Sequence, residues 1–254
     1  MRFFIHFAYN GTAYHGWQYQ PNAISVQQVL EQALETLLRT PVTLTAAGRT
    51  DTGVHARSMY AHFDIPDLPS PADITFRLAG VLPPDISVYS IRPVRADAHA
   101  RFDALSRTYE YWVTDTPNPY ANHLLTFTRY HLNYDLMNEA AAILLQERDF
   151  ASFCKAHSDN KTTFCHVTRA FWDERPMPFM PHETCHVFTI EADRFLRNMV
   201  RAVVGTLFEV GRGRMTIEHM RQAIEAHDRC AAGQSMPPDG LYLTDIRYSD
   251  DIFL

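Results

Sequence analysis

A short polar run, Arg49, Thr50 and Asp51, has residue types that could carry chemistry, and Gly48 and Gly53 flank it. A carboxylate on a loop can act as a nucleophile, and neighbouring glycines permit unusual backbone conformations and close approach of a large substrate. The same run also fits a turn in which Asp51 caps a backbone N–H and Arg49 forms a surface ion pair, which is the commoner arrangement in loops. Local residue types alone leave both interpretations open.

A second run, residues 182–186, reads HETCH and matches the HExxH pattern of zinc proteases. On a helix, His182 and His186 would bind one zinc ion and Glu183 would act as the general base. However, Pro178 and Pro181 precede the run, and the following residues alternate as in a strand, where the two histidines would stand about 13 Å apart. A zinc metalloprotease is therefore a remote alternative, and we expect no metal site.

Arginine supplies nearly all of the positive charge, because only Lys155 and Lys161 are lysines. The guanidinium group suits planar, bidentate contacts with phosphate. The net charge of -6 argues against a broadly basic nucleic-acid binder, yet a local basic groove remains open. The arginines gather in two stretches of the sequence, which contain Arg92, Arg95, Arg101 and Arg107, and Arg194, Arg197, Arg201, Arg212 and Arg214.

The elements that must position these residues are a mixture of strands and helices. Residues 2–9 alternate as a strand, and Ser25 is a plausible cap for a helix that ends before Pro41. Residues 42–46 lead as a short strand into the Asp51 loop, and residues 58–64 follow as another strand. Further strands are expected over residues 86–94, 107–114, 167–172, 185–191 and 241–248, and further helices from Pro71, over residues 135–146, from Phe195 and after Thr216.

Such a mixture with hairpin-length connections favours an α+β fold with a largely antiparallel sheet. We place a domain boundary near residue 105. Residues 1–105 then form an N-terminal α/β subdomain that carries the aspartate loop, and residues 106–254 form a C-terminal α/β subdomain that completes a central active-site cleft.

The string GRTDTGVHA at residues 48–56 resembles the central motif of TruA-type tRNA pseudouridine synthases, in which the aspartate two residues after the arginine is the nucleophile. The resemblance extends over nearly the whole chain, in matching order. Its other segments are YNG at 9–11, GWQ at 16–18, SVQ at 25–27, LPPDI at 82–86, HARFDA at 99–104, RTYEY at 107–111, DFASF at 149–153, FLRNMVR at 195–201 with Gly205, and GLYL at 240–243.

The resemblance implies a pseudouridine synthase fold, in which two subdomains share a largely antiparallel sheet flanked by helices. It also implies isomerisation of uridine to pseudouridine at positions 38, 39 and 40 of the tRNA anticodon stem-loop. The bond between ribose and N1 breaks, the base rotates, and the ribose rejoins it at C5. Family members are homodimers that need no cofactor, and the RNA crosses both subunits.

Residue by residue, the resemblance makes Asp51 the catalytic carboxylate and Arg201 the arginine paired with it. Tyr109 would stack against the target uracil, Arg49 would bind the phosphate of the flipped nucleotide, and Leu243 would form the apolar floor of the base pocket. A strand tyrosine and a strand leucine are equally ordinary core residues, and an arginine on a helix commonly faces solvent. These alternatives stay open on the sequence.

The segment expected to form a helix from Phe195 offers an argument of its own for Arg201. Arg194, Asn198 and Arg201 recur at spacings of four and three, which would place them on one face of that helix. A polar stripe on a largely apolar helix needs a partner. An anionic site with Asp51 and RNA phosphate would supply one, although bulk solvent would serve as well.

One departure from the family pattern is the pair Leu78-Ala79, where Leu-Asn is usual, and it puts a local hydrogen bond in doubt. A rival to the enzyme is an RNA-binding protein that kept the fold and lost the reaction. Intact Asp51, Tyr109 and Arg201 argue against it, because an RNA-binding protein has no need of a carboxylate opposite an anionic ligand.

Composition sets the remaining bounds. A chain of 254 residues with 46% hydrophobic and 20% charged residues can bury a sizeable core. The four cysteines form no CxxC pair, so we expect reduced thiols. No apolar run is long enough to span a membrane, and the first residues do not resemble a signal peptide, so a cytoplasmic location is expected.

Overall fold

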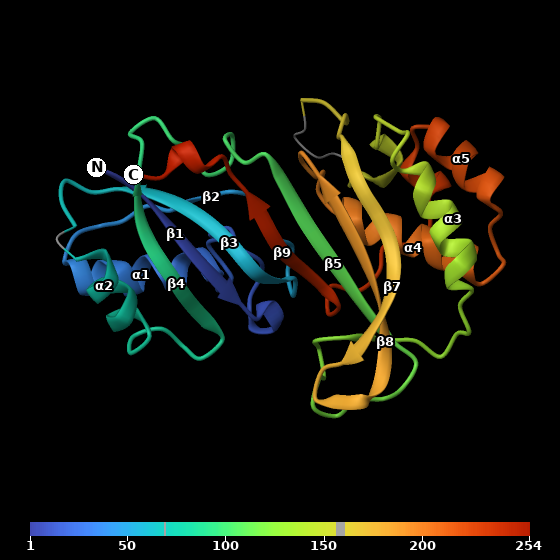
Figure 1. The fold of residues 1–254 in the computed structure, drawn as a ribbon, viewed down its shortest axis with the longest axis horizontal. Coiled ribbons are helices and arrows are strands. Elements are labelled where there is room, and N and C mark those ends of the chain that lie inside the picture. Colours follow the sequence, from blue (N-terminus) through green and yellow to red (C-terminus); the bar gives the residue numbers. More distant parts are fainter. Residues whose placement is uncertain (69, 156–160) are drawn as a thin grey trace. The chain divides into compact units, whose positions relative to one another are not determined.

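The computed structural model describes residues 1–68, 70–155 and 161–254. The chain forms two compact units (Figure 1): unit 1 comprises Met1–Arg107 together with Tyr242–Leu254, and unit 2 comprises Thr108–Leu241. The closing segment of the chain therefore belongs to unit 1, whereas the sequence-based division at residue 105 left it with the C-terminal half. Pairing between strands far apart in sequence leaves no local periodicity, so the sequence pattern did not reveal this return.

Unit 1 is built on strands in the order β4-β1-β3-β9, with the short β2 also paired to β3. Strand β1 runs antiparallel to β3 and to β4, while β3 and β9 are parallel, with His55 opposite Tyr242 and Ala56 opposite Leu243. The strands are β1 (Arg2–Tyr9), β2 (Thr45–Ala46), β3 (His55–Asp64), β4 (Ile86–Val94) and β9 (Leu241–Arg247), the last lying in unit 1 from Tyr242 onward.

Unit 1 also contains the helices α1 (Val26–Leu38) and α2 (Pro71–Leu78) and the 3-10 turns η1 (Gly11–Ala13) and η4 (Asp250–Ile252). The Ser25 side chain accepts a hydrogen bond from the N–H of Gln28, so the helix start expected at Ser25 is confirmed. Helix α1 buries Leu30 and Leu34, and α2 packs against β4. The unit 1 core is thus formed where the apolar helix stripe meets the sheet.

Unit 2 contains strands in the order β5-β8-β7, with the short β6 paired parallel to β5. Strands β7 and β8 form a long antiparallel hairpin that extends beyond the two strands expected from the sequence. The bounds are β5 (Ser106–Thr114), which lies in unit 2 from Thr108 onward, β6 (Thr126–Phe127), β7 (Val167–Met177) and β8 (Met180–Ala192). The expected α+β class, with a mixed, largely antiparallel sheet flanked by helices, is confirmed.

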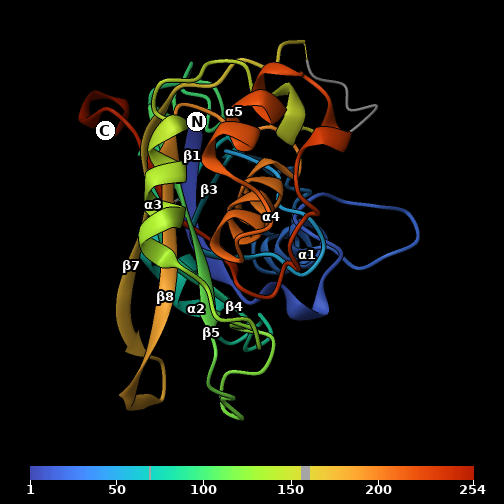
Figure 2. The same ribbon diagram turned by 90° about the vertical axis from the view of Figure 1, so that its right-hand side faces the viewer.

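The helices of unit 2 pack around α4, which is almost entirely buried. Helix α3 lies along β7 and against α4 (Figure 2), and the ring of Phe208 on α4 lies 6.2 Å from that of Trp172 on β7. The bounds are α3 (Tyr134–Ile143), α4 (Met199–Gly211) and α5 (Ile217–Glu225), with 3-10 turns η2 (Ala151–Phe153) and η3 (Arg229–Ala231). Within the described ranges, no helix has the length and apolar character that crossing a membrane requires.

Candidate active site

Asp51 lies in the loop that joins β2 to β3 in unit 1, as the sequence predicted. Its carbonyl accepts a hydrogen bond from the N–H of Val54 at 3.1 Å, which closes a tight turn, and Gly53 in this turn has a φ of +79°. The side chain of Arg49 is exposed, Thr50 is buried and Asp51 is half-buried. The loop therefore presents a partly accessible carboxylate next to a buried anchor.

That anchor is the side chain of Thr50. The Thr50 hydroxyl lies 2.8 Å from the hydroxyl of Tyr9 in a buried hydrogen bond. The backbone carbonyl of Thr50 also accepts a hydrogen bond from the N–H of Trp17 at 3.3 Å. Both partners come from the first 17 residues, far from the loop in sequence. The backbone directly before Asp51 is thus fixed on two sides.

Gly16 allows this close approach. It has a φ of +84°, and a Cβ at this position would lie 2.4 Å from the carbonyl oxygen of Thr50. Gly48, by contrast, has no positive φ, and apart from its chain neighbours no described atom lies within 4 Å of the place its Cβ would take. The backbone constraints on the Asp51 loop therefore fall on Gly16 and Gly53, and Gly16 is not one of the two glycines that flank the loop in the sequence.

Further contacts tie the N-terminal segment to the end of the loop. The N–H of Gly11 donates to Nδ1 of His55 at 3.0 Å, and the N–H of Gly53 donates to the carbonyl of Tyr14 at 3.2 Å. The hydroxyl of Tyr14 in turn donates to Asp85 at 2.7 Å, and burial together with this carboxylate raises the pKa of Tyr14. The sequence segments YNG and LPPDI, which carried no assigned role, therefore support the loop.

Leu243 lies on β9 beside the strand that leaves the Asp51 loop, and its side chain is almost fully buried. Its neighbour Tyr242 stacks on the ring of His55 at 4.6 Å, and the guanidinium of Arg57 lies 4.6 Å from the Tyr242 ring centroid. The burial of Leu243 suits both an ordinary core leucine and an apolar floor, so its predicted role remains a prediction.

Unit 2 carries the other two predicted residues. Tyr109 lies on β5, is only 9% exposed, and contacts Phe195 edge to face at 5.0 Å. Arg201 lies in the first turn of α4 and is half-buried; its Nε donates to the carbonyl of Met236 at 2.6 Å, and its own carbonyl accepts the N–H of Met236 at 3.0 Å. The guanidinium is therefore held in place by the backbone of the segment around Met236.

Gly205 brings this segment onto α4. A Cβ at Gly205 would lie 1.7 Å from the carbonyl oxygen of Gln234, so only glycine allows this packing. The amide of Asn198 also donates to the hydroxyl of Ser235 at 2.6 Å. The match at FLRNMVR with Gly205 thus corresponds to one local structure that fixes Arg201.

The polar helix stripe through Arg194, Asn198 and Arg201 is not formed. Helix α4 begins at Met199, and Asn198 has a φ of +68°, a left-handed conformation that cannot continue a helix. Of the three residues, only Arg201 is helical. The sequence predicted a helix from Phe195 because the apolar spacing continues through the residues before Met199. That spacing gives no signal for a single left-handed residue.

The HETCH run lies within β8, so its strand conformation is confirmed. The ring of His186 stacks on Tyr134 at 3.5 Å, and burial lowers the pKa of this histidine. Across residues 1–68, 70–155 and 161–254, no three His, Cys, Asp or Glu side chains come together in a way that could hold a metal ion. The geometry of a zinc protease is absent from this part of the chain.

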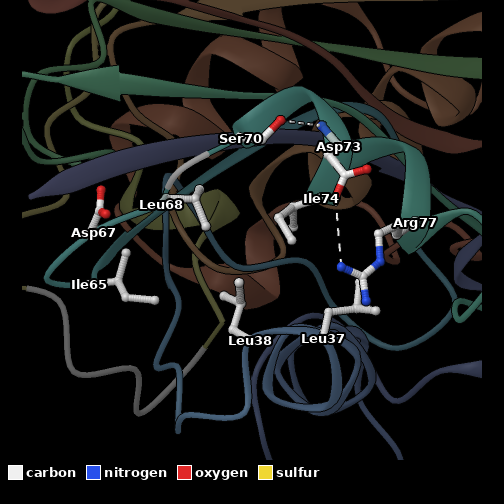
Figure 3. A pocket seen from close by; sticks show the side chains of 9 residues that line it. All are labelled: Leu37, Leu38, Ile65, Asp67, Leu68, Ser70, Asp73, Ile74 and Arg77. Carbon is white, nitrogen blue, oxygen red and sulfur yellow. Dashed lines mark hydrogen bonds and ion pairs between the residues drawn. The ribbon is translucent and has the colours of Figure 1, made fainter.

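A surface hollow of about 310 Å³ lies between the C-terminal end of α1 and α2, and it contains none of the predicted site residues (Figure 3). The hydroxyl of Ser70 caps α2 by accepting the N–H of Asp73, and Asp73 lies 3.7 Å from Arg77 in an exposed ion pair. These contacts cap and stabilise the start of α2, so we interpret the hollow as a gap left by the packing of two helices.

The chain belongs to the tRNA pseudouridine synthase family: the model of that family matches residues 5–103 and 140–249. The resemblance read from the motif strings is therefore confirmed, and with it the class of protein, a tRNA-modifying isomerase. The matched ranges include the Asp51 loop and α4.

Within this family, the chain is similar over its whole length to proteins named tRNA pseudouridine synthase A. It is 52% identical to the protein from Bacteroides thetaiotaomicron over 252 residues, which cover 99% of this chain and 92% of the relative. It is 52% identical to that of Porphyromonas gingivalis, covering 100% and 99% of the two chains. The protein from Chlamydia muridarum is 37% identical over 96% of this chain and 91% of its own length.

Proposed function

We propose that this protein converts uridine to pseudouridine at positions 38, 39 and 40 of the tRNA anticodon stem-loop, with Asp51 as the nucleophile. The observation that carries the proposal is the Asp51 loop itself. A partly accessible carboxylate follows a threonine whose side chain and carbonyl are both held by the N-terminal segment, within a chain of this family. Such preorganisation is what a nucleophile needs to reach one atom of a substrate.

The reaction needs a group that can add and then leave. The carboxylate forms a bond to the sugar or to the base, the bond between C1′ and N1 breaks, and the freed uracil rotates. C5 then bonds to C1′, the carboxylate departs, and the hydrogen on C5 is lost as a proton while N1 gains one. Atoms and charges balance without a cofactor, so the protein has only to bind, orient and move protons.

We assign the other predicted residues to steps of this reaction. Arg201 would pair with the Asp51 carboxylate and offset its negative charge, and the hydrogen bond from its Nε to the Met236 carbonyl, which fixes the guanidinium, supports that role. Tyr109 would stack on the uracil and assist loss of the C5 proton. The exposed Arg49 would bind the phosphate of the flipped nucleotide, and Leu243 would line the base pocket.

The proposed partners are tRNA and a second copy of the same chain, because family members act as homodimers. A tRNA substrate also implies a cytoplasmic site of action. Light scattering of the purified protein, with and without tRNA, tests the dimer: a monomer at micromolar concentration in both conditions would contradict it.

The function is tested with tRNA that carries tritium at uridine C5. We expect the wild type to release tritium and the Asp51→Ala, Asp51→Asn and Asp51→Glu variants to release none while their thermal unfolding stays normal. Asp245→Asn, which changes an exposed carboxylate of the same unit, is the matched control and should stay active. Full turnover by Asp51→Ala would refute the assignment, and an inactive wild type that still binds tRNA would favour an RNA-binding protein.

A further inference from the structure

An exposed aromatic ring and an exposed arginine stand together on the loop after β4. The side chain of Phe102 is 74% exposed, and the guanidinium carbon of Arg101 lies 5.8 Å from its ring centroid. We call these two residues the tip. A single exposed phenylalanine on a protein surface needs no explanation by itself, so the inference depends on how the tip is held.

The backbone on the N-terminal side of the tip is bound by side chains from β1, from β3 and from the segment just after β9. The hydroxyl of Tyr248, just after β9, donates to the carbonyl of Ala100, and the N–H of Ala100 donates to Nδ1 of His62 at 3.2 Å. Nη1 of Arg2 donates to the carbonyl of Ala98 at 2.9 Å. The loop is therefore rigidly attached although its outer residues face solvent.

Arg107 holds the other side. Its guanidinium donates to the carbonyls of Ala104, at 3.0 Å, and of Arg101, and also to the carbonyl of Ala47 at 3.1 Å. Ala47 stands four residues before Asp51 in the sequence. One side chain thus connects the tip to the strand end from which the catalytic loop begins.

The Phe102 ring rests on other rings. It lies 4.3 Å from the ring of His99, which in turn contacts His62 at 4.6 Å. Nδ1 of His99 accepts the N–H groups of Arg101 and Phe102, at 3.1 and 3.4 Å, so the same imidazole supports the ring and its backbone. One part of Phe102 is supported in this way while most of its surface stays open.

A supported, open aromatic ring beside a guanidinium is the arrangement by which proteins bind unpaired RNA bases. The ring stacks on a base, and the arginine binds the adjacent phosphate. A protein partner would instead bury on the order of 800 Å² on each side, which is far more than one ring and one arginine offer.

We propose that the tip is an RNA contact, in which Phe102 stacks on an unpaired nucleotide and Arg101 binds a neighbouring phosphate. This inference rests on the proposed function, because it takes tRNA as the ligand. It adds two binding residues to the predicted site. It also gives Arg107 a positioning role, since that residue fixes the tip relative to the start of the catalytic loop.

The binding test uses an unmodified tRNA transcript and a set of variants at one position. Phe102→Ala and Phe102→Leu, which lack an aromatic ring, should each weaken tRNA binding about tenfold, since stacking of one base contributes on this scale. Phe102→Trp should bind as the wild type does. Phe76→Ala removes an equally exposed phenylalanine from α2 and serves as the matched control, with unchanged binding expected. Thermal unfolding of all four should match the wild type.

A direct signal comes from the indole of the F102W variant. The natural Trp17, Trp112 and Trp172 are all buried, so tRNA should quench mainly the emission from the substituted position. Arg101→Gln should lower the slope of log Kd against log salt concentration by about 1. Emission that changes with protein concentration and not with tRNA would show a protein contact and overturn the proposal.

Tritium release measured in parallel separates the two proposals. If the wild type is active and Phe102→Ala binds tRNA normally, the tip proposal is wrong and the proposed function stands. If the wild type releases no tritium while Phe102→Ala binds tRNA more weakly than the wild type, the tip binds RNA and the proposed reaction is wrong.

Discussion

The hydroxyl groups of Tyr9 and Thr50 lie 2.8 Å apart in a buried hydrogen bond, one residue before Asp51. Tyr9 ends the first strand of unit 1, and Thr50 precedes Asp51, so the bond joins the sheet to the Asp51 loop. If Asp51 is the nucleophile, as proposed, its carboxylate must be held to a fraction of an ångström, and this pair helps to fix the backbone next to it.

We expect Tyr9→Phe to lower the free energy of unfolding by about 1–2 kcal/mol, because it leaves the buried Thr50 hydroxyl without this partner. The kcat for tritium release should fall more than KM rises, because the substitution shifts the Asp51 loop but removes no group that is proposed to bind RNA. Tyr120→Phe, at an exposed tyrosine, should change neither quantity.

A double-mutant cycle distinguishes a direct bond from general loosening. Thr50→Val also removes one partner, whereas the double variant removes both, so its loss of stability in urea unfolding should be smaller than the sum of the single losses. Strict additivity would show that the two hydroxyls do not interact.

Substitution by alanine should be costly at Gly16 and nearly neutral at Gly48. Gly16→Ala forces a side chain into a backbone with positive φ and against the Thr50 carbonyl, so we expect a loss of at least about 2 kcal/mol in unfolding free energy. Gly48→Ala should stay within about 0.5 kcal/mol of the wild type, because open space surrounds its Cβ position. Equal melting temperatures for the two variants would contradict the described packing.

Arg201→Ala should reduce kcat by about 10²–10³-fold, the scale observed when one group that stabilises charge at a reaction centre is removed. Arg201→Lys keeps the charge but not the Nε donor to Met236, so it should recover only part of the rate. Arg221→Ala, on the exposed side of α5, is the matched control. Wild-type rates in Arg201→Ala would remove this residue from the site.

Two histidines of unit 1, the half-buried His6 and the buried His62, should make the protein less stable in acid. Burial lowers the pKa of His6 and that of His62 to about 4, below the ordinary value of 6.5, so both are neutral in the native state near pH 7. The unfolded chain takes up these protons near pH 6.5, and the native state resists them until about pH 4. The contribution of the two histidines to the free energy of unfolding is therefore complete above pH 6.5 and is lost progressively as the pH falls toward 4.

Thermal melts between pH 7.5 and 4.5 test this dependence. We expect the melting temperature to fall by several degrees over this range and the fall to be smaller in His62→Asn, whose side-chain oxygen can still accept the Ala100 N–H. The difference between the two proteins isolates one histidine from the carboxylates that titrate in the same range. Parallel curves would show that His62 is not buried in neutral form.

Local patterns predicted the elements well wherever the physical cause was itself local. The Ser25 cap, the start of α2 at Pro71 and the strand character of the HETCH run all depend on neighbouring residues, and all three are confirmed. The position of the Asp51 loop between strands is confirmed for the same reason.

The contacts that fix the candidate site could not be read in this way. The hydroxyl of Tyr9 meets that of Thr50 from 41 residues away, and Gly16 approaches the carbonyl of Thr50, so neither contact leaves a periodic signal in the sequence. Helix α4 starts later than expected because Asn198 is left-handed. The spacing of apolar residues did not show this, since it cannot distinguish a helical residue from one that interrupts a helix. The roles of Asp51, Arg201, Tyr109 and the other predicted residues stay predictions until variants are assayed.

The parallel pairing of β9 with β3 affects how the protein is made. Strand β3 begins at His55, directly after the Asp51 loop, and its parallel partner in unit 1 is synthesised almost 190 residues later. The whole Asp51 loop therefore leaves the ribosome early, while the edge of β3 that pairs with β9 stays unpaired until β9 has been synthesised. We expect a nascent chain stalled before Tyr242 to be sensitive to protease at β3 and dependent on chaperones.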